Sequence, residues 1–258
     1  QITGTNGQLE PLDLSRLQAT IAKASEGLEG IDVQAIVDET VKNLYNGVKA
    51  TDISTTMMMA TRTRIEQEPN YTYVTARLLR DDLVATGLEF LGLPTDTNEG
   101  DALETFLKKG IELELLSPEL LNFDLAKLAA AIQPERSNQF TYLGLQTLFD
   151  RYFIHSDGVR FELPQLFFMR VSMGLSLNEE NREERAIEFY NLLSSFDYMA
   201  STPTLFNSGT LRPQLSSCYL TTIDDDLYDI YGAMRDNAML SKWAGGLGND
   251  WTPVRALN

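Results

Sequence analysis

Amphipathic segments of helical length, each opened by a capping residue and closed by a helix breaker, run through most of this 258-residue chain. In the first segment Asp13 precedes apolar residues at helical spacing, and Gly27 lies near its end. Asp32 opens a second segment, which Asn46-Gly47 closes. Because an apolar stripe of this period has to be buried against neighbouring elements, the pattern predicts a mainly helical chain.

The first 87 residues are predicted to form a small hairpin and four helices. Asn6-Gly7 between two short runs is a hairpin signal. A third helix is expected to be capped by Thr51 and to end near Pro69, and a fourth to span residues 71–87. The apolar residues expected to face inward in the first two helices are Leu14, Leu17, Ile21, Ala24, Leu28, Val33, Ile36, Val37, Val41 and Leu44.

Short helices are predicted for the middle of the chain, after a linker rich in Gly, Pro, Thr and Asn near residues 91–100. They are expected over residues 102–116, from Pro118, over 125–132, over 140–152, after Pro164, and after the charged run 178–185. In the helix over 140–152 the residues expected inward are Leu143, Leu145 and Leu148 or Phe149. His155 is expected in a solvated hairpin turn. It is the only histidine, which excludes a histidine-based metal site or catalytic triad.

The charge balance limits the classes of partner. The chain has 37 acidic and 21 basic residues and a net charge of −16. A surface for a nucleic-acid polymer needs basic stripes, so that class is excluded, whereas local amides and one or two cations suffice for small phosphates. No apolar run reaches 18 residues, so no membrane span is expected. The single cysteine forbids an internal disulfide and indicates a reducing compartment, here the cytoplasm.

That cysteine, Cys218, lies between a loop punctuated by Pro and Gly (201–209) and a Gly-rich run. Residues 218–223 alternate as in a strand. Asp224-Asp225-Asp226 is expected to cap a helix that ends near Lys242. The inward side chains expected in that helix are Leu227, Ile230, Tyr231, Met234, Ala238 and Leu240 or Ser241. A lone cysteine is more often an inert buried residue than a reactive one, so the residues alone leave both interpretations open.

Three motifs near the end of the chain resemble the large, catalytic subunit of class I ribonucleotide reductase in their order and spacing. They are Ser201-Thr202-Pro203-Thr204-Leu205-Phe206-Asn207-Ser208-Gly209, Leu215-Ser216-Ser217-Cys218-Tyr219-Leu220 and Ala244-Gly245-Gly246-Leu247-Gly248. The resemblance extends weakly through the whole chain, which is expected to be a piece of a longer protein. It implies thiyl-radical reduction of ribonucleotides for DNA synthesis. It also implies that the piece is inactive alone, because the other cysteines of the reaction are absent.

The resemblance also implies site residues and partners. Cys218 matches one of two cysteines that reduce the substrate and become a disulfide. The positions matching the substrate site are Thr204, Ser217, Cys218 and Gly246, and those matching the effector site are Asp225, Lys242 and Arg255. No metal site and no cofactor are expected in this chain. The expected partners are a small (beta) subunit that supplies the radical from its own metal centre, further alpha subunits, ATP and dNTP effectors, and thioredoxin or glutaredoxin as reductant.

The first 88 residues resemble the ATP-cone, a regulatory domain that distinguishes ATP from dATP. The matching marks are the Asn6-Gly7 turn, Glu10, Leu12-Asp13-Leu14, Tyr45-Asn46-Gly47-Val48-Lys49 and Ala76-Arg77-Leu78-Leu79. The family usually carries Lys or Arg in the strand before the turn, whereas here no basic residue precedes Arg16. Each missing charge-assisted hydrogen bond to a triphosphate costs roughly 1.5–3 kcal/mol. The residues therefore predict a degenerate cone, while an active regulatory cone stays the alternative, and another cone could precede this one.

The sequence thus predicts three parts. Residues 1–88 are expected to form the cone-like domain and 89–212 a helical domain. The resemblance to the reductase implies that residues 213–258 form the first strand and helix of the family's ten-stranded α/β barrel, with the strand lacking neighbours and therefore exposing an edge. An unrelated helical module for nucleotide sensing or subunit contact, without catalysis of its own, is the alternative that composition allows.

Overall fold

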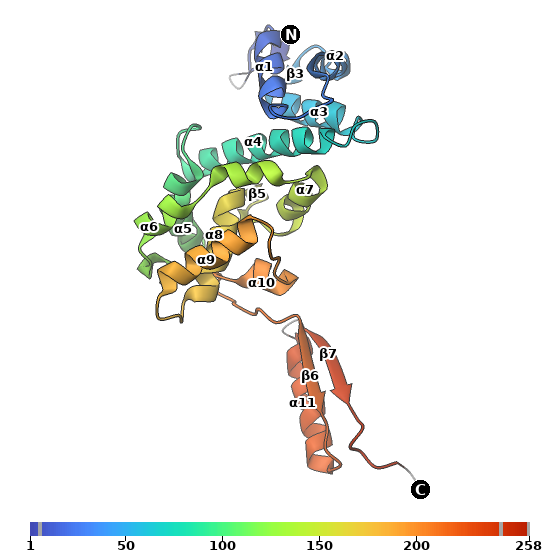
Figure 1. Ribbon diagram of the computed structural model, residues 1–258, viewed down its shortest axis with the longest axis vertical. Coiled ribbons are helices and arrows are strands. Elements are labelled where there is room, and N and C mark those ends of the chain that lie inside the picture. The colour runs from blue at the N-terminus through green and yellow to red at the C-terminus, as the bar shows by residue number, and fades with distance from the viewer. Residues whose placement is uncertain (5–6, 243–244, 257–258) are drawn as a thin grey trace. The chain divides into compact units, whose positions relative to one another are not determined.

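The computed structural model describes residues 1–4, 7–242 and 245–256. Helices dominate, and the strands are short (Figure 1). The predicted mainly helical class is therefore confirmed. Among the residues described, no helix has the length and apolar character needed to span a membrane.

The chain divides into two compact units. One comprises Gln1–Leu113 and Asp124–Phe167, and the other comprises Glu114–Phe123 and Phe168–Asn258. The chain passes from one unit to the other three times, and the last passage lies within a helix that begins at Pro164. The domain boundaries expected after residues 88 and 212 stay a prediction.

A three-stranded sheet opens the first unit. β1 (Ile2–Thr3) pairs antiparallel with β2 (Leu9–Glu10), as the hairpin signal predicts. Gly7 has a φ of 77°, in the left-handed region that glycine adopts without strain, while Asn6 lies outside the described residues. β3 (Val48–Lys49) adds a parallel pairing with β1. It carries no sequence signal of its own, because two residues leave no alternation to detect.

Four helices form the core of the same part. They are α1 (Leu14–Ala24), α2 (Val33–Asn43), α3 (Ala50–Arg62) and α4 (Tyr71–Leu91). Asp13 and Asp32 cap the first two as predicted, each accepting a hydrogen bond from the amide three residues further on. The shared core consists of Leu17, Ile21, Ala24, Ile36, Val37, Met57, Ala60, Tyr71, Val74 and Leu78. A hairpin with a four-helix bundle is thus confirmed, with β3 added.

The buried stripes of α1 and α2 are narrower than predicted. Leu14 and Val41, both expected inside, are 51% and 38% exposed. Both residues lie in a terminal turn of their helix, beyond the shared core of the bundle. α3 ends at Arg62 rather than near Pro69, since hydrogen-bonded turns occupy the residues between α3 and α4.

Two helix ends also differ from the prediction. Thr51 does not cap α3, whose N-cap is Lys49, because the helix begins directly from β3. Gly87 does not end α4. A Cβ at position 87 would lie 2.6 Å from Leu163 Cδ2, so this glycine permits close packing inside a helix that continues to its C-cap, Gly92.

The middle of the chain contains short elements near their predicted places. They are α5 (Glu99–Glu112), η1 (Pro118–Asn122), α6 (Leu125–Ala131), η2 (Pro134–Gln139), α7 (Tyr142–Arg151), β4 (His155–Ser156) and β5 (Val159–Arg160). Leu143 is 75% exposed, so its predicted burial is wrong, because α7 buries the face with Leu145 and Leu148 instead. His155 is exposed as expected, but it lies in β4, and the turn is Asp157-Gly158.

A buried carboxylate joins α5 to the start of α8 (Pro164–Ser176). Glu99 is 5% exposed, and its Oε2 accepts a hydrogen bond of 2.8 Å from the Gln165 amide in the first turn of α8. Burial raises the pKa of Glu99 to about 7, against the lowering effects of that hydrogen bond and of the Arg80 charge. This contact therefore depends on a group that titrates near neutral pH.

The second unit also contains α9 (Arg182–Ser194) and α10 (Thr202–Asn207). α10 lies inside residues 201–209, which the sequence predicts to be a loop, and that prediction is wrong. Pro203 occupies the first turn of α10, where its missing N–H would have had no partner within the helix. The proline thus marks a helix start rather than only a turn.

A strand–helix–strand element ends the described chain: β6 (Cys218–Thr222), α11 (Leu227–Lys242) and β7 (Gly246–Asp250). The strands are parallel and lie side by side, with α11 along them (Figure 1). β6 therefore has a neighbour on one side, so the prediction that this strand lacks neighbours is wrong. The Gly-rich run supplies that neighbour, and a Cβ at Gly248 would lie 2.8 Å from Leu220 Cδ2, so a glycine there permits close approach of the two strands.

The predicted inward face of α11 is wrong in this structure. Leu227, Tyr231 and Met234 are 70%, 64% and 52% exposed. Among the described residues after position 213, the only buried side chains are Ile223 and Ala233. The capping prediction is confirmed, since Asp226 Oδ1 accepts a hydrogen bond of 2.8 Å from the Tyr228 amide. An apolar helical pattern specifies a face, but not whether anything covers it.

Candidate functional site

Three of the predicted substrate-site residues meet at one end of the β6–β7 pair. Cys218 is the register partner of Gly246, and the Gly246 amide donates a hydrogen bond of 3.0 Å to the Ser217 carbonyl. A Cβ built on Gly246 would lie 3.6 Å from Cys218 Sγ. The Cys218 side chain is exposed. The strand pairing therefore leaves an accessible thiol beside a backbone without a side chain, where a ligand can approach closely.

Thr204, the fourth predicted substrate-site residue, lies on α10. Its Oγ1 donates a hydrogen bond of 3.1 Å to the Leu215 carbonyl, two residues before Ser217. The Thr204 hydroxyl also lies 3.3 Å from Ser201 Oγ. Thr204 is thereby tied to the segment that leads into β6.

Two of the three predicted effector-site residues contact each other. Arg255 Nε lies 2.6 Å from Asp225 Oδ2, although the Arg255 side chain is 80% exposed. Such an exposed ion pair stabilises the fold by roughly 0–1 kcal/mol. Lys242 is the last residue of α11 and is exposed. The Asp225–Arg255 pair can therefore be rearranged by a ligand at little cost.

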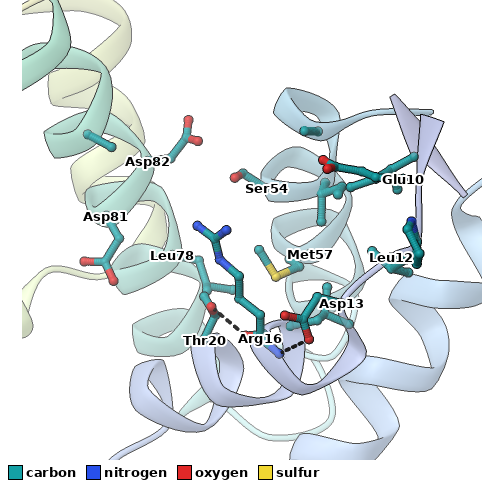
Figure 2. A pocket seen from close by; sticks show the side chains of 16 residues that line it. Glu10, Leu12, Asp13, Arg16, Thr20, Ser54, Met57, Leu78, Asp81 and Asp82 are labelled. Atoms are coloured by element: carbon teal, nitrogen blue, oxygen red, sulfur yellow. Dashed lines mark hydrogen bonds between the residues drawn. The ribbon is translucent and has the colours of Figure 1, made fainter. Parts of the chain in front are cut away.

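The cone-like part contains a cavity of about 520 Å³ between β1, the β2–α1 segment, α3 and α4. Figure 2 shows the Arg16 guanidinium extending between Asp81 and Asp82 of α4 on one side and Ser54 and Met57 of α3 on the other. Among the described lining residues Arg16 is the only cation. The acidic lining residues are Glu10, Asp13, Asp81 and Asp82.

Two of these four carboxylates already have partners within the protein. Asp13 Oδ1 caps α1 through the Arg16 amide at 2.9 Å, and Asp81 pairs with Arg80 at 2.7 Å. Glu10 and Asp82 remain as further carboxylates around the single Arg16 side chain. A triphosphate would meet one cation and a surplus of carboxylates here, which is electrostatically unfavourable.

The structure also brings together groups for which the sequence gives no signal. Asp81 and Asp82 lie on α4 and line the cavity, although they are some 70 residues away from the β2–α1 segment in the sequence. Among the described residues, no group of three or more His, Cys, Asp or Glu side chains has a geometry that could hold a metal ion.

Three family models match successive parts of the chain. Residues 1–84 match the ATP cone domain, residues 138–213 the all-alpha domain of ribonucleotide reductase, and residues 216–258 its barrel domain. The alpha subunit of ribonucleoside-diphosphate reductase from Chlamydia muridarum is 45% identical over 99% of this chain. The chain belongs to the large-subunit family of class I ribonucleotide reductase, as its N-terminal region.

Other large subunits of ribonucleotide reductase are similar to nearly the whole chain, at lower identity. The alpha subunit from Helicobacter pylori (strain 26695) is 34% identical over 98% of the chain, and the large subunit from Caenorhabditis elegans is 31% identical over 97%. The chain spans 25% of the length of the Chlamydia muridarum relative and 32% of the other two. The order predicted from the motifs, a cone, a helical domain and the start of the barrel, is thus confirmed.

Proposed function

We propose that this chain is part of a ribonucleoside-diphosphate reductase alpha subunit, which reduces ribonucleotides to deoxyribonucleotides under nucleotide control. The observation that carries the proposal is the meeting of Cys218, Ser217 and Gly246 at one end of β6–β7, inside the part that matches the barrel domain. The product class supplies DNA synthesis. The proposed location is the cytoplasm, because a free thiol that has to cycle requires a reducing compartment.

Cys218 is the proposed redox residue. The ribose loses its 2′ hydroxyl as water, and two electrons come from Cys218 and a second cysteine, which together become a disulfide. Thioredoxin or glutaredoxin returns that disulfide to two thiols. The reaction begins with a thiyl radical, and the radical originates in a separate small subunit with its own metal centre. Since this chain has one cysteine, it is proposed to be inactive by itself.

The residues around Cys218 have proposed binding roles. Thr204, Ser217 and the Gly246 backbone hold the ribonucleotide through hydroxyl and amide groups, which suit phosphate and ribose oxygens. Asp225, Lys242 and Arg255 hold a dNTP effector. An Asp carboxylate can accept from a deoxyribose hydroxyl, and Lys and Arg can pair with phosphates. The Asp225–Arg255 pair keeps these two groups together.

Replacing Cys218 in the full alpha subunit tests the proposal. Cys218→Ser is expected to abolish ribonucleotide reduction in the presence of the small subunit and reductant, because serine cannot form the disulfide. Ser216→Ala is the matched control and is expected to retain most activity. During a single turnover without reductant, Cys218 should become protected from alkylation. Wild-type turnover by Cys218→Ser would contradict the assignment.

A second role is proposed for the cone-like part, as a contact surface between subunits rather than a nucleotide sensor. The observation that favours it is the cavity with Arg16 as its only described cation among four carboxylates. ATP and dATP are expected to bind this cavity with a Kd weaker than about 1 mM, equivalent to about −4 kcal/mol. Titrating both nucleotides into residues 1–258 at physiological salt measures this, and micromolar binding at the cavity would instead favour an active regulatory cone.

The three-part division is also proposed. Residues 1–88 form the cone-like part, 89–212 the helical part and 213–258 the opening of the barrel. The family matches to residues 1–84, 138–213 and 216–258 support this order. The proposed partners are the small subunit and further alpha subunits.

A further inference from the structure

A buried arginine holds the C-terminal end of α10. Arg170 of α8 is 0% exposed, and its guanidinium donates to the Ser208 carbonyl at 2.7 Å and to the Leu205 carbonyl at 3.3 Å. A longer contact of 3.5 Å reaches the Phe206 carbonyl. The last carbonyls of a helix have no partners within it and carry partial negative charge, so a cation placed there is well matched.

Backbone contacts between α8 and the end of α10 are equally close. A Cβ at Gly174 would lie 2.1 Å from the Gly209 amide nitrogen, and Gly209 itself has a φ of 76°. Ser208 Oγ donates to the Val171 carbonyl at 2.6 Å. The two segments therefore meet backbone to backbone, and small shifts of α10 would cause clashes.

From α10, hydrogen bonds lead to the strand that carries the thiol. Asn207 Nδ2 donates to the Gln214 carbonyl at 2.7 Å, and Thr204 Oγ1 donates to the Leu215 carbonyl. Gln214 Nε2 in turn donates to the Ser216 carbonyl and to Tyr219 Oη, each at 2.8 Å. Because Ser216 precedes Ser217 and Tyr219 follows Cys218, these bonds bracket the proposed reacting group.

We infer that Arg170 is a positioning residue. Its buried guanidinium fixes α10, and α10 fixes residues 214–217 and therefore the place of Ser217 and Cys218. This inference rests on the proposed function for its catalytic meaning, but its structural half is independent of it. The hydrogen bonds described for Arg170 reach carbonyls at the end of α10, and none of these three carbonyls belongs to a proposed substrate-site residue.

The single cysteine allows a direct test in residues 1–258. A nitroxide spin label attached to Cys218 reports the local motion of β6. In Arg170→Met, which keeps the apolar stem but removes the donors, the mobile fraction of the spectrum is expected to rise at least twofold. Lysine has one ammonium group in place of the planar guanidinium with its several N–H donors. The mobile fraction in Arg170→Lys is therefore expected to lie between those of Arg170→Met and the wild type.

Met173→Ala is the matched control, because it shortens another fully buried side chain of α8 that donates no hydrogen bond. Its label spectrum is expected to match the wild type at a temperature where circular dichroism shows both proteins folded. An unchanged spectrum in Arg170→Met, or an equal rise in Met173→Ala, would overturn the inference.

If Arg170→Met does not fold, Asn207→Ala decides instead. It cuts the step from α10 to Gln214 and leaves the α8 contacts in place. The mobile fraction is then expected to rise in the same direction by a smaller factor, and no rise would overturn the inference.

The catalytic half is tested in the full alpha subunit with its small subunit. Asn207→Ala and Arg170→Lys are expected to raise the KM for the ribonucleotide about tenfold, with a smaller fall in kcat, because they misplace binding groups. Retention of the wild-type KM in both variants would overturn this half. Absence of any reduction by the wild-type subunit would instead contradict the proposed function, and the spin-label result would stand apart from it.

Discussion

The cone-like part and the β6–α11–β7 element differ in a way that separates fold from chemistry. The cone-like part has a complete helical core, with Ile21, Ile36 and Val74 fully buried, around a cavity whose charges disfavour a triphosphate. In β6–α11–β7, three of the proposed site residues meet, yet only Ile223 and Ala233 are buried among its described residues. One region has a complete core around a cavity lined by four carboxylates and, among its described lining residues, one cation, and the other has proposed site residues with very little core.

This difference shows that packing and binding residues are separable requirements. Apolar periodicity maintains the bundle whatever charges line its cavity, since Glu10 and Asp82 take no part in the core. Conversely, parallel strand pairing places Cys218 opposite Gly246 in a region that buries few side chains. Three experiments test this contrast.

The largest expected effect is a separate, early unfolding of β6–α11–β7. Both tryptophans of the chain, at positions 243 and 251, belong to this end of the sequence. Burial of apolar surface contributes roughly 25 cal/mol per Å², so a region with two buried side chains is only weakly stabilised. Tryptophan fluorescence is expected to change at lower urea concentrations than the helical circular dichroism signal. A single coincident transition would break the contrast.

A second, smaller effect concerns pH and the first unit. The pKa of Glu99 rises from 4.5 to about 7 on folding, so the folded state binds this proton more tightly. The resulting stabilisation is full below about pH 4.5 and is lost as the pH rises through 7. Its upper limit is about 3 kcal/mol. In the wild type this contribution to the free energy of unfolding declines between pH 5 and 8. Glu99→Gln is expected to flatten that decline, as urea unfolding monitored by circular dichroism can measure.

Glu104→Gln serves as the control for this experiment. Glu104 lies on the same helix, and its side chain is 59% exposed. The control should keep the decline of the wild type. If Glu99→Gln also keeps it, the buried contact with the Gln165 amide does not carry the pH dependence.

The smallest expected effect concerns the charge of the cone cavity. Asp82→Lys adds a cation and removes a carboxylate from the lining. It is expected to tighten dATP binding by about tenfold, or about 1.4 kcal/mol, as isothermal titration calorimetry can measure. Asp38→Lys makes the same charge change on α2, outside the lining, and is expected to alter the Kd less than twofold. Equal effects of the two variants would attribute the change to net charge rather than to the cavity.

Local signals are correct at three helix starts, although Thr51 does not cap α3 and Gly87 does not end α4. Asp13, Asp32 and Asp226 cap the helices that they were predicted to cap, because a cap needs only a side-chain oxygen and amides two or three residues away. Predictions failed where the partner lies far along the chain. β3 pairs with β1, and β7 pairs with β6. The two residues of β3 and the glycine-rich sequence of β7 do not by themselves predict these pairings.

The candidate site divides in the same way. The resemblance in motif order predicts Thr204, Ser217, Cys218 and Gly246 as site residues, which stay a prediction. Arg170 carries no signal in the sequence, because an arginine within a helical pattern is normally a solvated residue, whereas here it is fully buried. Only the fold turns it inward onto the carbonyls at the end of α10.

Periodicity, capping residues and motif spacing are local properties of the chain, so the mainly helical class, the caps at Asp13, Asp32 and Asp226 and the family follow from the sequence alone. The tertiary structure decided which apolar faces are covered, which strands pair and which charges share a cavity. These depend on contacts between residues tens of positions apart. Arg16 and Asp82 are ordinary surface residues in the sequence, and they become a single electrostatic environment only when α1 and α4 pack together.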